Sequence, residues 1–232
     1  MKTFADKVIA FNKSLHFKGN LPAGIRIMNP FREDPEVNKV SAAFYRKYYN
    51  DTHRRHIILG INPGRFGGGL TGIPFTDPKR LVEKCGIPFH GAMAHEPSSV
   101  FIYEMVDAFG GPDAFYQRIY INSICPLGFT SARPNGKEVN YNYYDSAELT
   151  NAVYEFMNES IRKQLRFGIH CDTAFCFGTG KNEKFLRKLN EEHGYFKQIV
   201  ALEHPRFIIQ YKSKQRQFYI EKYLSAFEPG SR

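Results

Sequence analysis

The chain has 232 residues, of which 42% are hydrophobic and 15% aromatic, so it can bury a sizeable core and is neither a disordered nor a fibrous protein. Its formal net charge of +9 indicates a polyanionic partner such as nucleic acid, although charge alone does not separate nucleic-acid-binding proteins from other basic proteins. No stretch approaches the roughly 20 apolar residues of a membrane span, and the N-terminal segment lacks a signal-peptide core, so we expect a cytoplasmic or nucleoid-associated protein without membrane contact.

In chain order, the hydrophobic periodicity predicts alternating helices and short apolar strands, each strand ending near Gly, Pro or Asn. The predicted elements are helix Ala5–Leu15, helix Val37–Tyr49, strand His56–Ile61, helix Ser98–Phe109, strand Ile119–Ile124, helix Asp145–Leu165, strand Ala174–Phe177, helix Lys181–His193, strand Ile199–Leu202 and helix Gln215–Phe227.

Alternation of helices with strands that are apolar on both faces favours a mostly parallel sheet with helices on each side. The predicted fold is therefore an α/β protein, a three-layer α/β/α sandwich around a central, mostly parallel four-stranded sheet. We expect residues 1–232 to form a single domain, in which residues 1–50 are a helical part without a recognisable motif.

The cysteines indicate neither a disulfide framework nor a metal site. Cys85, Cys125, Cys171 and Cys176 are scattered along the chain without a CxxC pair, and the spacing around His170 is not that of zinc ligands. We expect no metal and no cofactor.

Ligands of such sheets bind beyond the carboxyl ends of the strands, so chemistry is expected in the segments that follow each predicted strand. These segments contain Asn62-Pro63-Gly64, Asn122, Gly178-Thr179-Gly180-Lys181 and Glu203-His204-Pro205-Arg206.

The segment of residues 60–75 is rich in Gly and Pro, which lets main chain approach a ligand, although glycines also serve plain surface loops. Neither this segment nor residues 178–182 has the GxxxxGK[ST] pattern, which excludes a phosphate-loop nucleotide hydrolase.

Two side chains at strand ends are candidate ligand contacts. His204 precedes Pro205, which ends the strand and leaves the imidazole at the rim of the sheet. Asn122 either recognises a ligand or caps a helix or turn.

Taken together, the strand ends resemble the uracil-DNA glycosylase superfamily, and within it the single-strand-selective monofunctional (SMUG) type. Residues 60–64, followed by Phe66-Gly67 and by residues 71–75, resemble that family's water-activating and base-stacking loop. Residues 122–127 resemble its base-recognition motif, and His204-Pro205 resembles its second catalytic motif. The resemblance covers roughly residues 57–214.

The resemblance implies two catalytic residues. Asn62 would orient the attacking water, but an amide cannot take a proton as a carboxylate would, so catalysis should depend on stabilising the leaving base. His204 would supply that stabilisation by donating a hydrogen bond to uracil O2.

The resemblance also implies a substrate-binding set of Ile61, Gly64, Phe75 and Asn122. Phe75 would stack on the base, and the Asn122 amide would read its Watson–Crick edge and reject cytosine. Gly64 stands where more uracil-exclusive relatives carry a bulky aromatic, which leaves room for C5 substituents such as that of 5-hydroxymethyluracil.

The DNA contacts follow the second catalytic motif. Arg206 and Phe207 would act as plug and wedge, and Lys212 and Lys214 would bind phosphates, although residues 206–214 depart from the family's usual small and proline-rich pattern. In the loop of residues 130–136, Arg133 would contact the backbone.

The resemblance thus implies a monomeric, monofunctional DNA glycosylase that acts in base excision repair. It would flip uracil or a C5-modified uracil out of DNA and hydrolyse its N-glycosidic bond with water, since no lysine stands where a Schiff-base nucleophile is needed. Two alternatives stay open, a non-catalytic nucleic-acid-binding protein on the same fold and a glycosylase that prefers deaminated purines such as xanthine.

Overall fold

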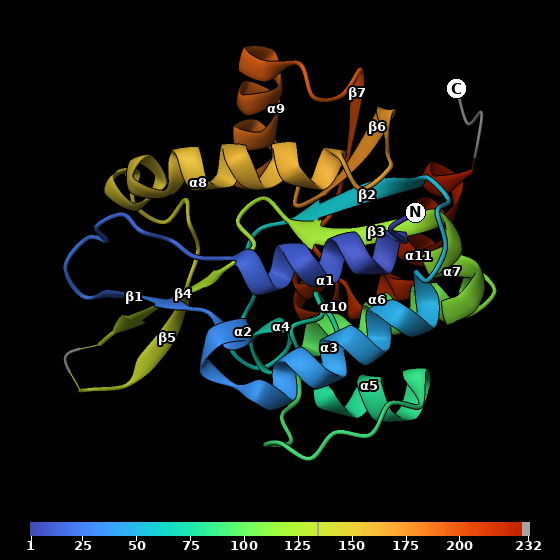
Figure 1. Ribbon diagram of the computed structural model, residues 1–232. Helices are drawn as coiled ribbons and strands as arrows, with labels where there is room; N and C mark the ends of the chain where they lie inside the picture. The colour runs from blue at the N-terminus through green and yellow to red at the C-terminus, as the bar shows by residue number, and fades with distance from the viewer. Residues whose placement is uncertain (134, 229–232) are drawn as a thin grey trace.

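The computed structural model describes residues 1–133 and 135–228 (Figure 1). Its helices are α1 (Phe4–Ser14), α2 (Pro30–Glu33), α3 (Pro35–Tyr48), α4 (Gly68–Thr71), α5 (Pro78–Cys85), α6 (Pro97–Ala108), α7 (Pro112–Arg118), α8 (Ala147–Leu165), α9 (Lys181–His193), α10 (Pro205–Tyr211) and α11 (Arg216–Phe227), with a 3₁₀ turn at Ser213–Gln215. Its strands are β1 (Ile25–Met28), β2 (Arg55–Gly60), β3 (Ile119–Ser123), β4 (Gly128–Ala132), β5 (Glu138–Tyr141), β6 (Ile169–Phe177) and β7 (Gln198–Leu202).

The central sheet contains the four predicted strands in the order β3-β2-β6-β7, and every neighbouring pair is parallel. β6 begins at Ile169 rather than at Ala174, because its first residues are polar and partly exposed and so lack the apolar signal. In the middle of the sheet, Leu59 of β2 pairs with Asn122 of β3 and with Cys176 of β6. This register decides which side chains share a face.

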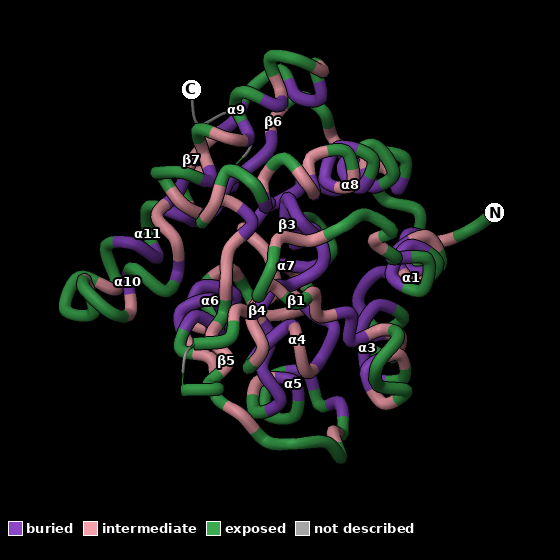
Figure 2. The backbone as a smooth tube through the Cα atoms, turned by 90° about the vertical axis from the view of Figure 1, so that its left-hand side faces the viewer, coloured by how far each residue is buried: buried purple, intermediate pink, exposed green. Residues whose placement is uncertain are grey.

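Helices cover both faces of the central sheet, which confirms the three-layer α/β/α fold (Figure 1). On one face, Phe4 of α1 packs edge-on against Tyr120, with 5.2 Å between ring centroids. On the other face, Tyr223 of α11 packs against Phe177, with 5.3 Å between centroids, and also against Phe101 of α6. Buried residues accordingly lie in the strands and on the inward sides of the helices, and β3 is buried along its length (Figure 2).

A second, antiparallel sheet of order β1-β4-β5 lies beside the central one and was not predicted. Its strands are only four or five residues long, and β1 and β5 have mostly half-buried residues without a clear alternation of apolar and polar side chains. Periodicity therefore gives no signal for them. This sheet matters because the chain leaving β5 contacts the site at the end of β2.

The amino end of β2 is fastened by Arg55, whose side chain is completely buried. Its guanidinium donates to both Asp51 carboxylate oxygens and to the carbonyls of Tyr48, His53 and Tyr116. These contacts use all of the N–H donors of an arginine.

Among the described residues, no helix combines the length and the apolar character that crossing a bilayer requires.

Candidate active site

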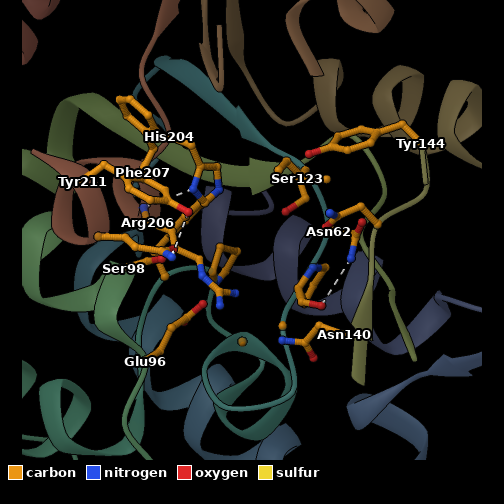
Figure 3. A pocket seen from close by; sticks show the side chains of 18 residues that line it. Asn62, Glu96, Ser98, Ser123, Asn140, Tyr144, His204, Arg206, Phe207 and Tyr211 are labelled. Atoms are coloured by element: carbon orange, nitrogen blue, oxygen red, sulfur yellow. Dashed lines mark hydrogen bonds between the residues drawn. The ribbon is translucent and has the colours of Figure 1, made fainter. Parts of the chain in front are cut away.

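A cavity of about 600 Å³ opens at the carboxyl ends of β2, β3 and β7 (Figure 3). Of the predicted site residues, Ile61, Asn62, Gly64, Phe75, His204, Arg206 and Phe207 line it. Asn122, Arg133, Lys212 and Lys214 do not. The remaining lining residues are Pro63, Gly68, Pro74, Glu96, Ser98, Ser123, Asn140, Asn142, Tyr144, Gln210 and Tyr211.

The Asn62 side chain is held in one orientation by the chain that leaves β5. Its Oδ1 accepts a hydrogen bond from the Tyr143 N–H at 3.0 Å, and its Nδ2 donates to the Tyr141 carbonyl at 3.2 Å. An amide oxygen has two lone pairs, so Oδ1 can still accept a bond from a water in the cavity. The antiparallel sheet thus fixes the amide that stands at the end of β2.

His204 is neutral and its tautomer is determined by a hydrogen bond. Burial, followed by the positive charge of Arg206, lowers the pKa of His204 to about 4. The Arg206 backbone N–H donates to His204 Nδ1 at 3.1 Å, where the imidazole caps helix α10. Nδ1 must therefore be an acceptor, and the ring proton lies on Nε2 as a donor for a ligand.

Phe75 is held in an unusual backbone conformation beside His204. Its φ of 56° lies in the left-handed region, which costs a residue other than glycine on the order of 1 kcal/mol. The ring lies 5.6 Å from the His204 ring and 5.4 Å from Phe177, measured between centroids. A Cβ added at Gly60 would lie 2.9 Å from this ring, so the Phe75 ring can pack here only because position 60 has no side chain.

The strand register turns the Asn122 side chain away from the cavity. Asn122 shares a face of the sheet with Tyr120, and its amide donates to the Tyr120 hydroxyl at 2.7 Å and accepts from the Ser123 N–H at 2.8 Å. Because side chains alternate along a strand, the next residue, Ser123, lies on the opposite face and lines the cavity. Of these two neighbouring residues, the structure therefore places Ser123, and not Asn122, at the cavity.

Ser123 was not predicted as a lining residue, because its place depends on the register between β2 and β3, which the sequence alone does not show. Gly60 pairs with Ser123 across β2 and β3, and Gly60 carries the Phe75 ring on its cavity side. Given this register, the alternation of side chains along β3 places Ser123, and not Asn122, beside Phe75.

Two polar side chains that the sequence did not indicate face Gly64. A Cβ added at Gly64 would lie 3.3 Å from Asn140 Nδ2 and 3.6 Å from Glu96 Oε1. Asn140 comes from β5, and its Oδ1 accepts from the Arg65 N–H at 3.2 Å. Residues from an unpredicted strand and from a distant loop thus form the wall next to Gly64.

The segment after His204 is a short helix, α10, rather than an irregular loop. Phe207 is 41% exposed and Tyr211 is 65% exposed, and their rings lie 5.5 Å apart at the cavity mouth (Figure 3). Lys212 and Lys214 follow the helix without reaching the cavity, and Arg133 is exposed near the turn between β4 and β5. The helix therefore presents two aromatic rings where a single wedge was expected.

Among the described residues, no three His, Cys, Asp or Glu side chains gather as a ligand set for a metal ion.

Two comparisons with known proteins, one with family models and one with solved structures, give matches. A family model for the Uracil DNA glycosylase superfamily matches residues 46–228. A solved crystal structure described as wild-type SMUG2 of Pedobacter heparinus is similar with a TM-score of 0.96 and 66% sequence identity, and the alignment covers 98% of this chain and 97% of that chain. No curated protein matches the chain.

Proposed function

The chain belongs to the uracil-DNA glycosylase superfamily and is a DNA glycosylase, a hydrolase that acts on DNA in repair, and we propose that it excises uracil and C5-modified uracils after flipping them into the cavity beside Asn62 and His204. One observation carries this proposal. Asn62 at the end of β2 and His204 at the end of β7 are far apart in sequence but face one cavity of about 600 Å³.

Asn62 would place the water that attacks the anomeric carbon of the sugar. Its Nδ2 is bonded to Tyr141 at the end of β5 and its Oδ1 to Tyr143 just after β5, which fixes the orientation of the amide. The remaining lone pair of Oδ1 can accept from that water. An amide does not take up the proton, so the bond to the base must be largely broken before water adds.

His204 would stabilise the departing base. The neutral ring offers Nε2–H to the oxygen on which negative charge develops, and the bond from the Arg206 N–H to Nδ1 fixes the ring before the reaction. A neutral donor strengthens its bond as charge builds on the acceptor and transfers no proton.

The base would stack on Phe75 and be read by Ser123. Stacking on an aromatic ring is worth roughly 1–3 kcal/mol per base. A hydroxyl rotates to donate or to accept, so Ser123 discriminates between a carbonyl and an amino group less sharply than an amide would. We therefore expect a broader range of deaminated bases than an asparagine at this point would allow.

A hydroxyl at position 123, in place of an amide, favours a second candidate substrate in the same cavity, a deaminated purine such as xanthine. Xanthine presents carbonyl oxygens as uracil does, and the hydroxyl of Ser123 does not exclude the larger ring.

Gly64 supports the proposal for C5-modified uracils. Gly64 lines the cavity together with Asn140 and Glu96, and a Cβ here would already lie 3.3 Å from Asn140 Nδ2. The absence of a side chain therefore keeps the neighbouring cavity space for a substituent on the base. An aromatic residue at position 64 would fill that space.

Helix α10 would hold the opened DNA. Phe207 and Tyr211 present apolar rings at the mouth, which suits insertion into the gap left by a flipped base, and Arg206 brings a positive charge beside them. Unstacking costs a few kcal/mol per step, and these contacts would offset that cost.

The experiment is single-turnover cleavage of single- and double-stranded oligonucleotides containing uracil, 5-hydroxymethyluracil, xanthine or hypoxanthine. We expect alkali-labile abasic sites from both uracils. Binding without cleavage of any lesion would favour the non-catalytic alternative, and fastest cleavage of xanthine would favour the purine. Within the described chain no lysine lines the cavity, so we expect no covalent adduct after borohydride treatment.

A further inference from the structure

A carboxyl group lies inside the proposed active site without an assigned role. Glu96 immediately precedes helix α6, and its side chain lines the same cavity as Asn62 and His204 (Figure 3). Neither the resemblance to glycosylases nor the mechanism above gives this residue a task.

The glycine-rich loop is shaped around this carboxyl. A Cβ added at Gly67 would lie 1.7 Å from Glu96 Oε2 and 2.6 Å from its Cδ, so any side chain at position 67 would displace the carboxyl. The other oxygen, Oε1, would lie 3.6 Å from a Cβ added at Gly64, which also lines the cavity. The Glu96 carboxyl therefore packs against Gly67 and extends towards Gly64.

The backbone of Glu96 is fixed by a buried carboxylate. Asp77 accepts from the Glu96 N–H at 2.9 Å and from the Ser99 hydroxyl at 2.8 Å. It also accepts from the Arg80 backbone N–H at 2.9 Å and from Arg80 Nη1 at 3.3 Å. The backbone of Glu96 is thus fixed, while its Oε2 has no hydrogen-bond partner among the described residues.

Glu96 Oε2 is buried and has no hydrogen-bond partner among the residues that the structure describes. A buried carboxylate without partners is costly, and such a group becomes neutral instead. Burial, with the negative charge of Asp77 and against the positive charge of Arg206, raises the pKa of Glu96 to about 7. The charged and titratable side chains around it are Asp77 and Arg206, Arg80 and His95, which both contact Asp77, and His204, which lines the same cavity.

We propose that Glu96 is a specificity-determining residue of the active site that works as a neutral carboxylic acid and donates its O–H to an exocyclic oxygen of the flipped base at the edge next to Gly64. This inference rests on the proposed function. No proton is transferred, because the bond only shortens as negative charge spreads onto that oxygen while the glycosidic bond breaks. A base with an amino group at this edge would face a second donor and be rejected.

The rate of excision should depend on the protonation state of Glu96. Below the pKa the acid donates and excision is fast, and above it the carboxylate repels the anionic leaving base and excision slows. DNA phosphates disfavour the carboxylate further, so the midpoint in the complex lies at or above 7. Over the two pH units around the midpoint a single group passes from about nine-tenths to about one-tenth protonated, so the rate should fall about tenfold. His204 titrates far below this window.

The experiment compares single-turnover uracil excision across this pH range for the wild type, Glu96→Gln and Glu96→Ala. We expect the wild-type rate to fall about tenfold, whereas E96Q, whose amide donates at every pH, shows a flat profile and exceeds the wild type at high pH. E96A should be slow and flat. The matched control is Glu104→Gln in helix α6. The Glu104 carboxylate pairs with Arg216 and lies outside the cavity. This variant should keep the wild-type profile.

A second readout does not require activity. The ¹³C shift of the Glu96 carboxyl carbon in the free protein should titrate near pH 7, and a midpoint below 5 would overturn the inference. Identical pH profiles of wild type and E96Q, or a folded E96Q that is inactive at every pH, would also overturn it. If the wild type cleaves no substrate while Glu96 titrates near pH 7, the proposed function is wrong, but Glu96 is still a carboxyl group that is neutral below pH 7.

Discussion

At the amino end of β2 the buried Arg55 uses every N–H donor on protein acceptors. In the cavity at the opposite end of the sheet, Asn62, Glu96 and His204 retain bonding capacity that the described protein groups do not use. Arg55 also lies between the rings of Phe4 and Tyr49, with its Cζ 4.7 Å and 4.8 Å from their centroids. One end of the sheet is closed by its own contacts, and the other is left open for a ligand. We therefore expect substitutions at the closed end to lower stability and substitutions at the open end to lower activity.

The largest effect is expected at the open end. Asn62→Ala and His204→Ala should each slow uracil excision on the order of a hundredfold to a thousandfold, because each removes a group fixed in advance for the reaction. Binding of the oligonucleotide should change much less. Single-turnover rates and binding curves check this, and normal rates in both variants would remove the proposed mechanism.

At the closed end the effect should be on folding. Arg55→Met should lower the free energy of unfolding by on the order of 3 kcal/mol, because several buried carbonyls and the Asp51 carboxylate lose their partner. The control Arg54→Met changes an exposed neighbour and should cost about 1 kcal/mol or less. Denaturant unfolding measures both. An R55M protein that keeps its stability but loses its excision rate would contradict the division between the two ends.

The same division between activity and stability should separate two adjacent residues of β3, Ser123 and Asn122. Ser123→Ala should slow excision about tenfold and alter base choice, since it removes one hydrogen bond of about 1.4 kcal/mol from the cavity. Asn122→Ala should leave base choice unchanged and lower stability by about 1–2 kcal/mol, since its amide bonds only the protein. The reverse pattern on a panel of lesions would restore Asn122 as the reading residue.

The last effect appears only below neutral pH and concerns the stability that His204 contributes. Its pKa in the folded protein is about 4, below the ordinary value of 6.5, so the unfolded chain takes up a proton first as the pH falls. The contribution of the neutral ring is fully present above 6.5 and is lost as the pH falls towards 4. His204→Asn keeps a helix-capping side chain but does not titrate, so its unfolding free energy should depend less on pH in this range. Parallel curves for the two proteins would contradict the burial of a neutral imidazole.

Local sequence determined much of this protein. Apolar runs bounded by Gly, Pro and Asn placed the strands of the central sheet, because a strand buried on both faces must be apolar at every position. The same runs located Asn62 and His204, since the carboxyl ends of parallel strands meet at one edge.

Only the tertiary structure decided the rest. The sheet of β1, β4 and β5 is short and half-buried, so nothing local marks it, yet the chain leaving it orients the Asn62 amide. Whether Asn122 or Ser123 faces the ligand depends on strand register, and a shift of one residue reverses the face. The place of Glu96 depends on a loop folding back onto Gly67, a contact between distant segments that no periodicity records.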